Sequence, residues 1–402
     1  MAGRIVVDGA MLEKAKELRH ELHRHAELSL NERETKRILM DFLAKNTSLE
    51  LHDMGAWFYA AYRSPERSKG PRRIAFRADM DALPIDEGCS LAYSSKTRGV
   101  SHKCGHDGHS ASLAAFALAV DRCGCENDIF FLFQHAEENG AGAAVCEALI
   151  ALEHIDEIYG CHNMPGFPMG SVAVHDGVAA CASTGLVLKL TGRNSHASQP
   201  ENGLNPAYAL AELIGAIPSL VDEAAEAEGT AQRGVPGFAM SDTGVVMCTV
   251  VGAEVGSKAD GGGTNAFGTS AGFARLMLTV RAEDESRLER LKELLIERLG
   301  RLAHGHGLAA EHELADPFPE TRNDPACAEK VRRAAERAGL PPARWDEPFR
   351  SSEDFGRYTK LIPGALFYIG CGESHAPLHT VSYDFSDELI AFAAEMFAQL
   401  AE

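Results

Sequence analysis

The sequence predicts an α/β protein with a mostly parallel or mixed central sheet, flanking helices and an inserted α+β domain. Three short apolar runs, at residues 72–80, 127–135 and 156–162, have the length and composition of buried strands. The segments between them carry the apolar spacing of helices, and strand–helix–strand units build parallel sheets that are covered by helices. The chain has 402 residues, which is long enough for two domains.

The order of the predicted elements changes near Thr184. After this point the order is strand, helix, strand, strand, helix, strand, which is that of a split βαβ sandwich with a four-stranded antiparallel sheet and two helices on one face. The predicted strands are residues 185–193, 244–252, 273–282 and 308–315, and the predicted helices are residues 205–217 and 285–303. We therefore expect one domain of residues 1–183 and 319–402, interrupted by a ferredoxin-like domain of residues 184–318.

The composition excludes several classes of function. A formal net charge of −19 argues against a nucleic-acid partner, because a phosphate backbone is bound by clustered Lys and Arg side chains. The first 22 residues run into an amphipathic helical pattern and contain no apolar segment long enough for a signal peptide or a membrane span. The ten cysteines are too sparse for a disulfide scaffold and include no C-x-x-C pair. We expect a cytoplasmic protein without a membrane partner.

The stretch HKCGHDGHS, residues 102–110, places one thiol and three imidazoles close together. Polar residues also follow the three predicted strands of the first domain. They are Asp79 and Asp81, Glu137 and Glu138, and His162 and Asn163. Ligands of open parallel sheets bind at the carboxyl ends of the strands. The polar side chains therefore gather where a functional site is expected.

Residues of these motifs and one late histidine form a set of nitrogen, sulfur and oxygen donors. The candidate metal ligands are Cys104, His106, Glu138, His162 and His379. Five protein ligands exceed the three of a single catalytic zinc with an open position, but they suit two metals that share a bridging water. Glu137 precedes Glu138 at a strand end, where successive side chains point to opposite sides, so one can hold metal while the other acts as a base. Thiolate and imidazole ligands favour zinc, and manganese or cobalt could load the same site.

Other residues of these motifs have structural explanations. His102 and His109 are interpreted as packing residues or as residues that orient ligands. Asp81 precedes ALP at a strand end and is favoured as an orienting carboxylate, ahead of Asp79. Surface, capping or bracing roles are expected for His20, His23, His25, His304, His306, Glu353 and Asp354. Gly140 and Gly142 do not indicate a dinucleotide-binding loop, because the third glycine of that motif is missing. The H-x-E and P-C-x-x-C pair of a zinc nucleobase deaminase is also absent.

Motifs along nearly the whole chain resemble those of the dimetal amidohydrolases and peptidases, a family that includes aminoacylases, hippurate hydrolase, indole-3-acetyl-amino-acid hydrolases and N-acetyl-diaminopimelate deacetylase. The motifs are HELHRHAELSLNE, AFRADMDALPI, HKCGHDGHSASLAAF, FLFQHAEENGAGA, GCHNMPGFPMGSV, LTGRNSHASQPENGLNPA, PFPETRNDP, SSEDFGRY and PLHTVSYDF. The resemblance implies that the five candidate ligands hold metal and that Glu137 is the general base. It also implies that the inserted domain is a lid and dimerisation domain, from which His196 reaches across a dimer interface into the active site of the partner.

The chain departs from the family pattern at two places in the inserted domain. Relatives often have Pro-His after the histidine motif, where this chain has QPENG. They commonly have an Asn-Val-Ile-Pro run followed by an arginine, where this chain reads NAFGTSAGFARLMLTVR, with no proline and a longer gap between Asn265 and Arg281. In relatives these positions help to hold the carboxylate of the substrate. The change in this region makes hydrolysis of a different C–N bond credible. By the resemblance, His196, Asn265 and Arg281 are nevertheless the expected substrate-binding residues.

Together, the motifs predict a metal-dependent hydrolase that cleaves the amide C–N bond of an N-acyl amino acid or a related small amide. Glu137 is the expected base for a metal-bridged water, and His196 is the expected donor to the oxyanion. One alternative is hydrolysis of a non-peptide C–N bond, in an aromatic amine or a carbamoyl group, on the same scaffold. Another is a non-enzymatic metal or ligand sensor, for which Glu137 would be unnecessary. We expect a small-molecule substrate and a homodimer or dimer-based oligomer.

Overall fold

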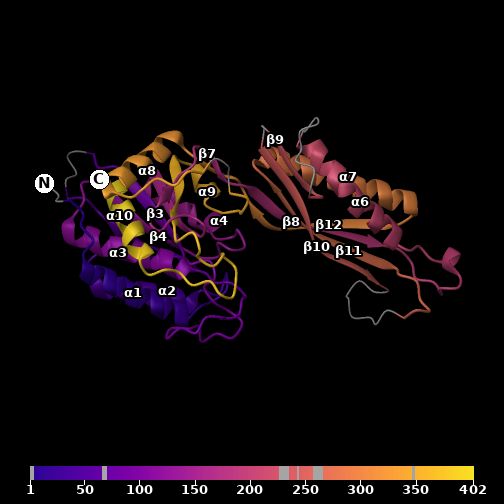
Figure 1. Ribbon diagram of the computed structural model, residues 1–402, viewed down its shortest axis with the longest axis horizontal. Coiled ribbons are helices and arrows are strands. Elements are labelled where there is room, and N and C mark those ends of the chain that lie inside the picture. Colours follow the sequence, from indigo (N-terminus) through magenta and orange to yellow (C-terminus); the bar gives the residue numbers. More distant parts are fainter. Residues whose placement is uncertain (1–3, 66–69, 226–234, 242–243, 257–265, 346–348) are drawn as a thin grey trace. The chain divides into compact units, whose positions relative to one another are not determined.

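The computed structural model describes residues 4–65, 70–225, 235–241, 244–256, 266–345 and 349–402. The chain forms two compact units (Figure 1). The first comprises Met1–Ala179, Thr321–Pro348 and Glu353–Glu402, and the second comprises Ala180–Glu320 and Phe349–Ser352. None of the described helices is long and apolar enough to cross a membrane.

The first unit is built on a seven-stranded sheet. Its strands are β1 (Glu50–Asp53), β2 (Phe58–Tyr62), β3 (Arg73–Asp79), β4 (Asp128–Gln134), β5 (Glu157–Met164), β6 (Val172–Ala173) and β14 (Gly364–Gly370). They lie in the order β1-β2-β4-β3-β5-β14-β6. The central neighbours β4, β3, β5 and β14 pair in parallel, and the outer pairs are antiparallel. A separate two-stranded sheet pairs β7 (Gly177–Ala180) with β13 (Thr321–Asn323).

Helices surround this sheet, and one of them is central to the unit. The helices are α1 (Gly9–Arg24), α2 (Arg33–Asn46), α3 (His106–Cys123), α4 (Ala143–Cys146), α5 (Ala148–Glu153), α8 (Pro325–Ala338), α9 (Gly356–Thr359) and α10 (Leu389–Ala401). Helix α3 is buried along its length from His106 to Val120. Its first turns are attached to the end of β3, because Ser110 Oγ donates to the carbonyl oxygen of Asp79 at 2.7 Å.

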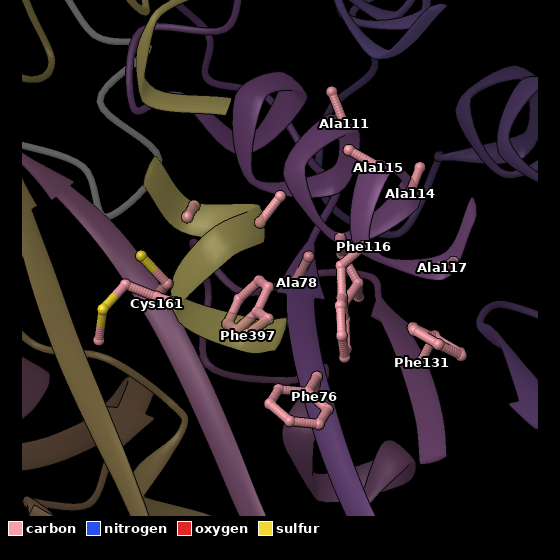
Figure 2. Close-up of a cluster of buried hydrophobic side chains, with 14 of the residues drawn as sticks. Phe76, Ala78, Ala111, Ala114, Ala115, Phe116, Ala117, Phe131, Cys161 and Phe397 are labelled. Carbon is pink, nitrogen blue, oxygen red and sulfur yellow. The ribbon is translucent and has the colours of Figure 1, made fainter. Parts of the chain in front are cut away.

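Aromatic and alanine side chains fill the core between the sheet, α3 and α10 (Figure 2). The ring of Phe76 on β3 packs edge-on against Phe116 of α3 and Phe397 of α10, with centroid distances of 4.9 and 5.3 Å. Phe131 of β4 contacts Phe116 at 5.3 Å. Such aromatic pairs stabilise the fold beyond their buried area. They fix α3 against β3 and β4, which places its first residue, His106, near the carboxyl ends of these strands.

The second unit is an antiparallel sheet with two long helices. The strands, in spatial order, are β12 (Ala309–Phe318), β8 (Ala182–Thr191), β11 (Phe273–Ala282), β10 (Gly244–Gly256) and β9 (Phe238–Ser241). Helices α6 (Ala207–Ala224) and α7 (Glu285–His306) lie side by side along one face of this sheet (Figure 1). Leu186, Leu188 and Leu190 alternate along β8 and share one core with Leu213 of α6 and Leu295 of α7. Every second residue of the strand faces this core from one side, and the apolar faces of the two helices cover it from the other.

The mixed central sheet confirms the predicted α/β class, and two details differ from the prediction. The sheet of the second unit has five strands where four are expected, because β9 adds to β10 through an antiparallel pairing. In the first unit, His162 and Asn163 lie inside β5 and not after it. The strand continues because β14 pairs with it as far as Met164.

Candidate metal centre and active site

The five candidate metal ligands come from separate parts of the first unit. Cys104 lies in the loop before α3, and His106 is the first residue of that helix. Glu138 lies in the turn after β4, His162 in β5, and His379 in the loop between β14 and α10. These positions are at or beyond the carboxyl ends of the parallel strands, where ligands of such sheets bind.

The donor atoms of these residues converge. Cys104 Sγ is 3.5 Å from Nε2 of His162 and 3.3 Å from Nε2 of His379. Glu138 Oε1 is 3.7 Å from Nε2 of His379 and 3.7 Å from Nε2 of His106. Three sets of donor atoms each lie within 4.8 Å of one another: Cys104, His106 and His162; Cys104, Glu138 and His379; and His106, Glu137 and Glu138.

This donor set fits divalent metal ions. His106 Nε2 and Glu138 Oε1 are buried and make no hydrogen bond to any described residue. Buried polar atoms of folded proteins are almost always paired, so two such atoms that face each other at 3.7 Å indicate a cation site. A thiolate, imidazoles and a carboxylate are also the ligands that zinc and related metals take.

Two of the histidine rings are oriented through their second nitrogen. His106 Nδ1 is hydrogen bonded to Asp81 Oδ1 at 3.2 Å. His162 Nδ1 donates to the carbonyl oxygen of Asn163 at 2.8 Å. Partners of this kind fix the tautomer of a ligand histidine and aim Nε2 at the metal. The structure therefore gives Asp81 the geometry of an orienting carboxylate.

A strained turn follows β4. Ala136 has a φ of 49°, in the left-handed region that residues with a Cβ rarely adopt. The Gly142 amide closes the turn by donating to the Ala136 carbonyl oxygen at 2.9 Å. A Cβ on Gly142 would lie 1.7 Å from the carbonyl oxygen of His135, so only glycine fits there. Strained backbone of this kind persists only where the surroundings hold it.

Glu137 and Glu138 lie in this turn. The prediction that they alternate along a strand is wrong, because the strand ends at Gln134 and the backbone then changes direction. Both carboxylates instead approach the same imidazole. Glu137 Oε2 is 3.9 Å and Glu138 Oε1 is 3.7 Å from His106 Nε2. The turn thus brings two consecutive carboxylates to one point, which strand alternation would prevent.

Burial dominates the acid–base properties of the cluster. Burial, followed by the nearby carboxylate of Glu353, raises the pKa of Glu137 well above its usual range. Burial likewise raises the pKa of Glu138 to about 8 and raises the pKa of the Cys104 thiol. Burial lowers the pKa of His162, which keeps the imidazole neutral and able to offer Nε2. Bound cations would favour the carboxylates and the thiolate in their charged forms.

A buried arginine lies beside this cluster. The guanidinium of Arg77 on β3 forms ion pairs with Asp79 at 2.6 Å, Glu353 at 3.0 Å and Asp354 at 3.0 Å. Burial opposes its charge, but these carboxylates outweigh burial and hold the pKa of Arg77 well above its ordinary value. Arg77 is absent from the predicted site residues. A charged residue inside an otherwise apolar strand is the signal that could have found it.

His109 and Gly105 support the loop that carries the candidate ligands. Asp79 Oδ1 lies 2.6 Å from His109 Nδ1, and Asn163 Oδ1 lies 2.6 Å from His109 Nε2. Because both ring nitrogens are engaged, His109 braces the cluster. Gly105, directly before α3, has a φ of 98°, and a Cβ there would meet Asn163 Oδ1 at 2.4 Å.

The predicted substrate-binding residues belong to the second unit. His196 is exposed in the segment after β8, where it forms an isolated antiparallel bridge with Thr269, and its Nδ1 is 2.6 Å from Ser198 Oγ. Arg281 of β11 is half-buried and donates from Nη1 to Ser352 Oγ at 2.7 Å. Asn265 lies outside the described residues.

Comparisons with known proteins agree with this chemistry. The chain is 28% identical over 388 residues to N-acetylcysteine deacetylase of Bacillus subtilis, covering 96% of this chain and 95% of the relative. It is 26% identical to hippurate hydrolase of Campylobacter jejuni, covering 96% and 94% of the two chains. The crystal structure of a dinuclear metal binding peptidase from the M20 family of Bacillus subtilis matches with a TM-score of 0.77 at 25% identity, covering 98% of each chain. The sequence model of Peptidase family M20/M25/M40 matches residues 75–402, and the chain therefore belongs to this family.

Proposed function

We propose that the chain is a metal-dependent amidohydrolase that cleaves the amide bond of an N-acyl amino acid or a related small amide. The observation that carries this proposal is the convergence of metal-type donors on one point beside a further buried carboxylate, Glu137. Ligands alone would serve a metal sensor, whereas a carboxylate at the edge of the ligand set is what a hydrolase needs as a base. The deacetylase and hippurate hydrolase relatives support the same class of substrate.

We infer that the five candidate ligands hold two divalent metal ions, with zinc or manganese the expected metals and cobalt a third option. When bound, the ions lower the pKa of a water molecule and polarise the scissile carbonyl. The number of donors supports two ions, because a single catalytic zinc usually takes three protein ligands. Protein purified without chelator should then hold close to two equivalents at saturation by elemental analysis. A firm limit of one equivalent, unchanged by Cys104→Ala, would contradict the two-metal site.

Glu137 moves the proton in this reaction. Its carboxylate takes a proton from the attacking water and then delivers it to the leaving nitrogen. Burial and the neighbouring Glu353 raise the pKa of Glu137, which makes it a better proton acceptor than an exposed glutamate. Asp81 holds the ring of His106 in place while this happens.

The substitution Glu137→Gln tests the base. The amide keeps the shape of the side chain but cannot accept the proton, so kcat for N-acetylcysteine and hippurate should fall on the order of 10²-fold or more. Metal content and fold should stay unchanged. Glu138→Gln is the matched variant at the next position, and it should lower the metal content. If Glu137→Gln stays active and Glu138→Gln keeps both metals, the two roles are assigned wrongly.

Hydrolysis of an aromatic amine or a carbamoyl group is not favoured. Relatives that match along nearly the whole chain include deacetylases, a hippurate hydrolase and a thermostable carboxypeptidase. A carbamoylase-family amidase matches at 14% identity, which shows only a shared fold. An assay panel that includes carbamoyl compounds and arylamides alongside N-acyl amino acids would separate these classes.

We further propose that residues 1–183 and 319–402 form the catalytic domain and that residues 184–318 form a lid and dimerisation domain. In a homodimer, His196 acts in trans as a donor to the oxyanion at the metal centre of the partner. Arg281 and Asn265 hold the carboxylate of the substrate. The exposure of the His196 side chain on the second unit supports a role outside its own fold.

Mixing two inactive variants tests the shared site. His196→Ala and Glu137→Gln are combined under conditions that allow subunit exchange. A mixed dimer contains one site with both wild-type residues, so activity should recover to at most about a quarter of the wild-type level, given random exchange and independent sites. No recovery despite proven exchange would mean that His196 serves its own subunit or has no catalytic role.

We also place the protein in the cytoplasm. All ten cysteines are free thiols, including the buried Cys104 of the candidate metal centre. Disulfides are rare in reducing compartments, and a thiol ligand is best preserved there.

A further inference from the structure

The segment of residues 27–35 lies against the catalytic turn. It comprises the loop before α2 and the first turn of that helix, and it falls outside the residues that the family model matches. Leu28 forms a parallel bridge with Ala82, and the Ala82 amide donates to the Glu27 carbonyl oxygen at 2.8 Å. The segment is therefore attached to the chain directly next to Asp81.

Ser29 contacts the carboxylate that orients His106. Its hydroxyl donates to Asp81 Oδ2 at 2.7 Å. The same oxygen accepts the backbone N–H of Glu138 at 3.0 Å, while Oδ1 is bonded to His106 Nδ1 at 3.2 Å. Asp81 thus holds two candidate metal ligands at once. Ser29 fixes the orientation of this carboxylate from the side away from the imidazole.

Glu32 contacts the backbone of the strained turn. Its Oε1 accepts the N–H of Ala136 at 2.6 Å, and both residues are buried. Glu32 occupies the N-cap position of α2, yet its side chain makes no capping hydrogen bond. Glu27 performs that task, since its Oε2 accepts the amide and the hydroxyl of Thr35 at 2.9 and 3.0 Å. The carboxylate of Glu32 is therefore committed to the turn and not to the helix.

We propose that Ser29 and Glu32 are positioning residues of the hydrolytic site, which hold Glu137 and Glu138 in place from the N-terminal segment. The inference rests on the proposed roles of these two glutamates. Ala136 keeps its left-handed φ only while its surroundings hold it, and the bond from Glu32 ties its amide. Loss of that bond leaves a buried N–H without a partner, which the turn can relieve only by moving.

The acceptor oxygen of Glu32 is the feature that matters. Burial, together with the charge of Asp81, raises the pKa of Glu32 to about 7, so a neutral side chain is tolerated at this place. Glu32→Gln keeps an oxygen that can accept the Ala136 N–H, whereas Glu32→Ala removes it. A merely electrostatic role would make these two variants alike. Rescue by glutamine therefore separates positioning from charge.

The test compares Glu32→Ala, Glu32→Gln and Ser29→Ala with a control, Glu34→Ala. Glu34 carries the same carboxylate two positions later, in the first turn of α2, but it is half-exposed and paired with Arg37. Glu32→Ala should lower kcat about 10- to 100-fold with little change in KM, and should speed amide hydrogen exchange in residues 133–140. Glu32→Gln should restore both. Ser29→Ala should weaken zinc binding about 10-fold in competition with a chromophoric chelator.

The exchange and zinc measurements decide the inference without any turnover. If the wild-type protein hydrolyses none of the amides, the proposed function fails, while these two measurements still test the positioning roles. Equal exchange rates in Glu32→Ala and Glu34→Ala would overturn the role of Glu32, as would a Glu32→Gln variant as impaired as Glu32→Ala. If Glu32→Ala does not fold, Ser29→Ala decides, because it removes a single oxygen atom. Zinc affinity at the wild-type level in that variant would overturn the proposal.

Discussion

In the first unit the side chains of Arg19, Arg77 and Lys103 lie in the interior together with several carboxylates, whereas the described part of the second unit buries no charged side chain. The polar residues that the second unit buries there are Ser183 and Thr184. Removing an ion from water costs free energy that is offset only by well-placed partners. The first unit therefore carries an energetic cost in its interior that the second unit avoids.

This difference shows that apolar packing alone accounts for the interior of the second unit, whereas the interior of the first unit also holds buried charges. Alternating leucines of β8 and the apolar faces of α6 and α7 account for the interior of the second unit. The first unit has an apolar core of the same kind, but it also holds two networks of buried charge, one around Arg77 and one around His23. Both networks contact residues beside the candidate metal ligands. The cost of these charges is therefore linked to the site.

The substitution Arg77→Met should have the largest effect on stability. It leaves Asp79, Glu353 and Asp354 buried without their cation, and breaking a buried pair in this way lowers the free energy of unfolding by about 3–5 kcal/mol. Urea unfolding followed by circular dichroism measures the loss. Hydrogen exchange should locate it in the first unit.

If Arg77→Met lowered the free energy of unfolding by less than about 1 kcal/mol, the contrast between the two interiors would fail where the largest effect is expected. It would mean that the three carboxylates take up protons and remain buried at little cost. The buried charges of the first unit would then carry little free-energy cost relative to the apolar interior of the second unit.

The fold class and the family are predictable because they depend on local patterns. The apolar runs at residues 72–80 and 127–135 overlap β3 and β4, and the mixed sheet and the family match confirm the two predictions. The five candidate ligands were found in the same way, from short motifs. The structure brings their donor atoms together, and their roles in binding metal stay predictions.

The remaining features depend on contacts between distant parts of the chain. The strained turn at Ala136 is held partly by Glu32, which is 104 positions away in the sequence. The expected surface or capping role of His23 is wrong, because this residue is buried between Glu87 and Asp107, 64 and 84 positions away. The periodicity of α1 cannot show which buried position meets a carboxylate.

His23 should make stability depend on pH. Burial alone would lower its pKa, but hydrogen bonds to Asp107 and Glu87 outweigh burial and raise the pKa to about 9. The pKa in the folded state lies above the unfolded value of about 6.5, so the contribution of His23 is fully present below about pH 6.5 and is lost as the pH rises through 9. At low pH it is on the order of 3 kcal/mol.

The variant His23→Gln measures this contribution when its unfolding free energy is compared with that of the wild type from pH 6 to 10. The difference should be greatest at the acid end and should shrink toward pH 10. His306→Gln is the matched control in the second unit, because His306 lies at the exposed end of α7 beside the half-exposed Glu212. Its effect should stay below about 1 kcal/mol. A difference for His23→Gln that does not change with pH would show that the residue contributes through packing and not through charge.

The smallest effect on stability is expected for Lys189→Met. Like Arg77→Met, it removes a cationic side chain from a strand, here in the second unit. Lys189 lies on β8 between the buried Leu188 and Leu190, so its side chain points away from the core. It pairs with Glu313 of β12 at 2.5 Å, but the two side chains are 24% and 61% exposed. Water and salt screen such a pair, so the free energy of unfolding should change by about 1 kcal/mol or less, and the change should shrink in high salt. If Lys189→Met instead destabilised the protein as much as Arg77→Met, ion pairs would contribute equally to the stability of both units. The proposed contrast between buried charges in the first unit and an apolar interior in the second would then be wrong.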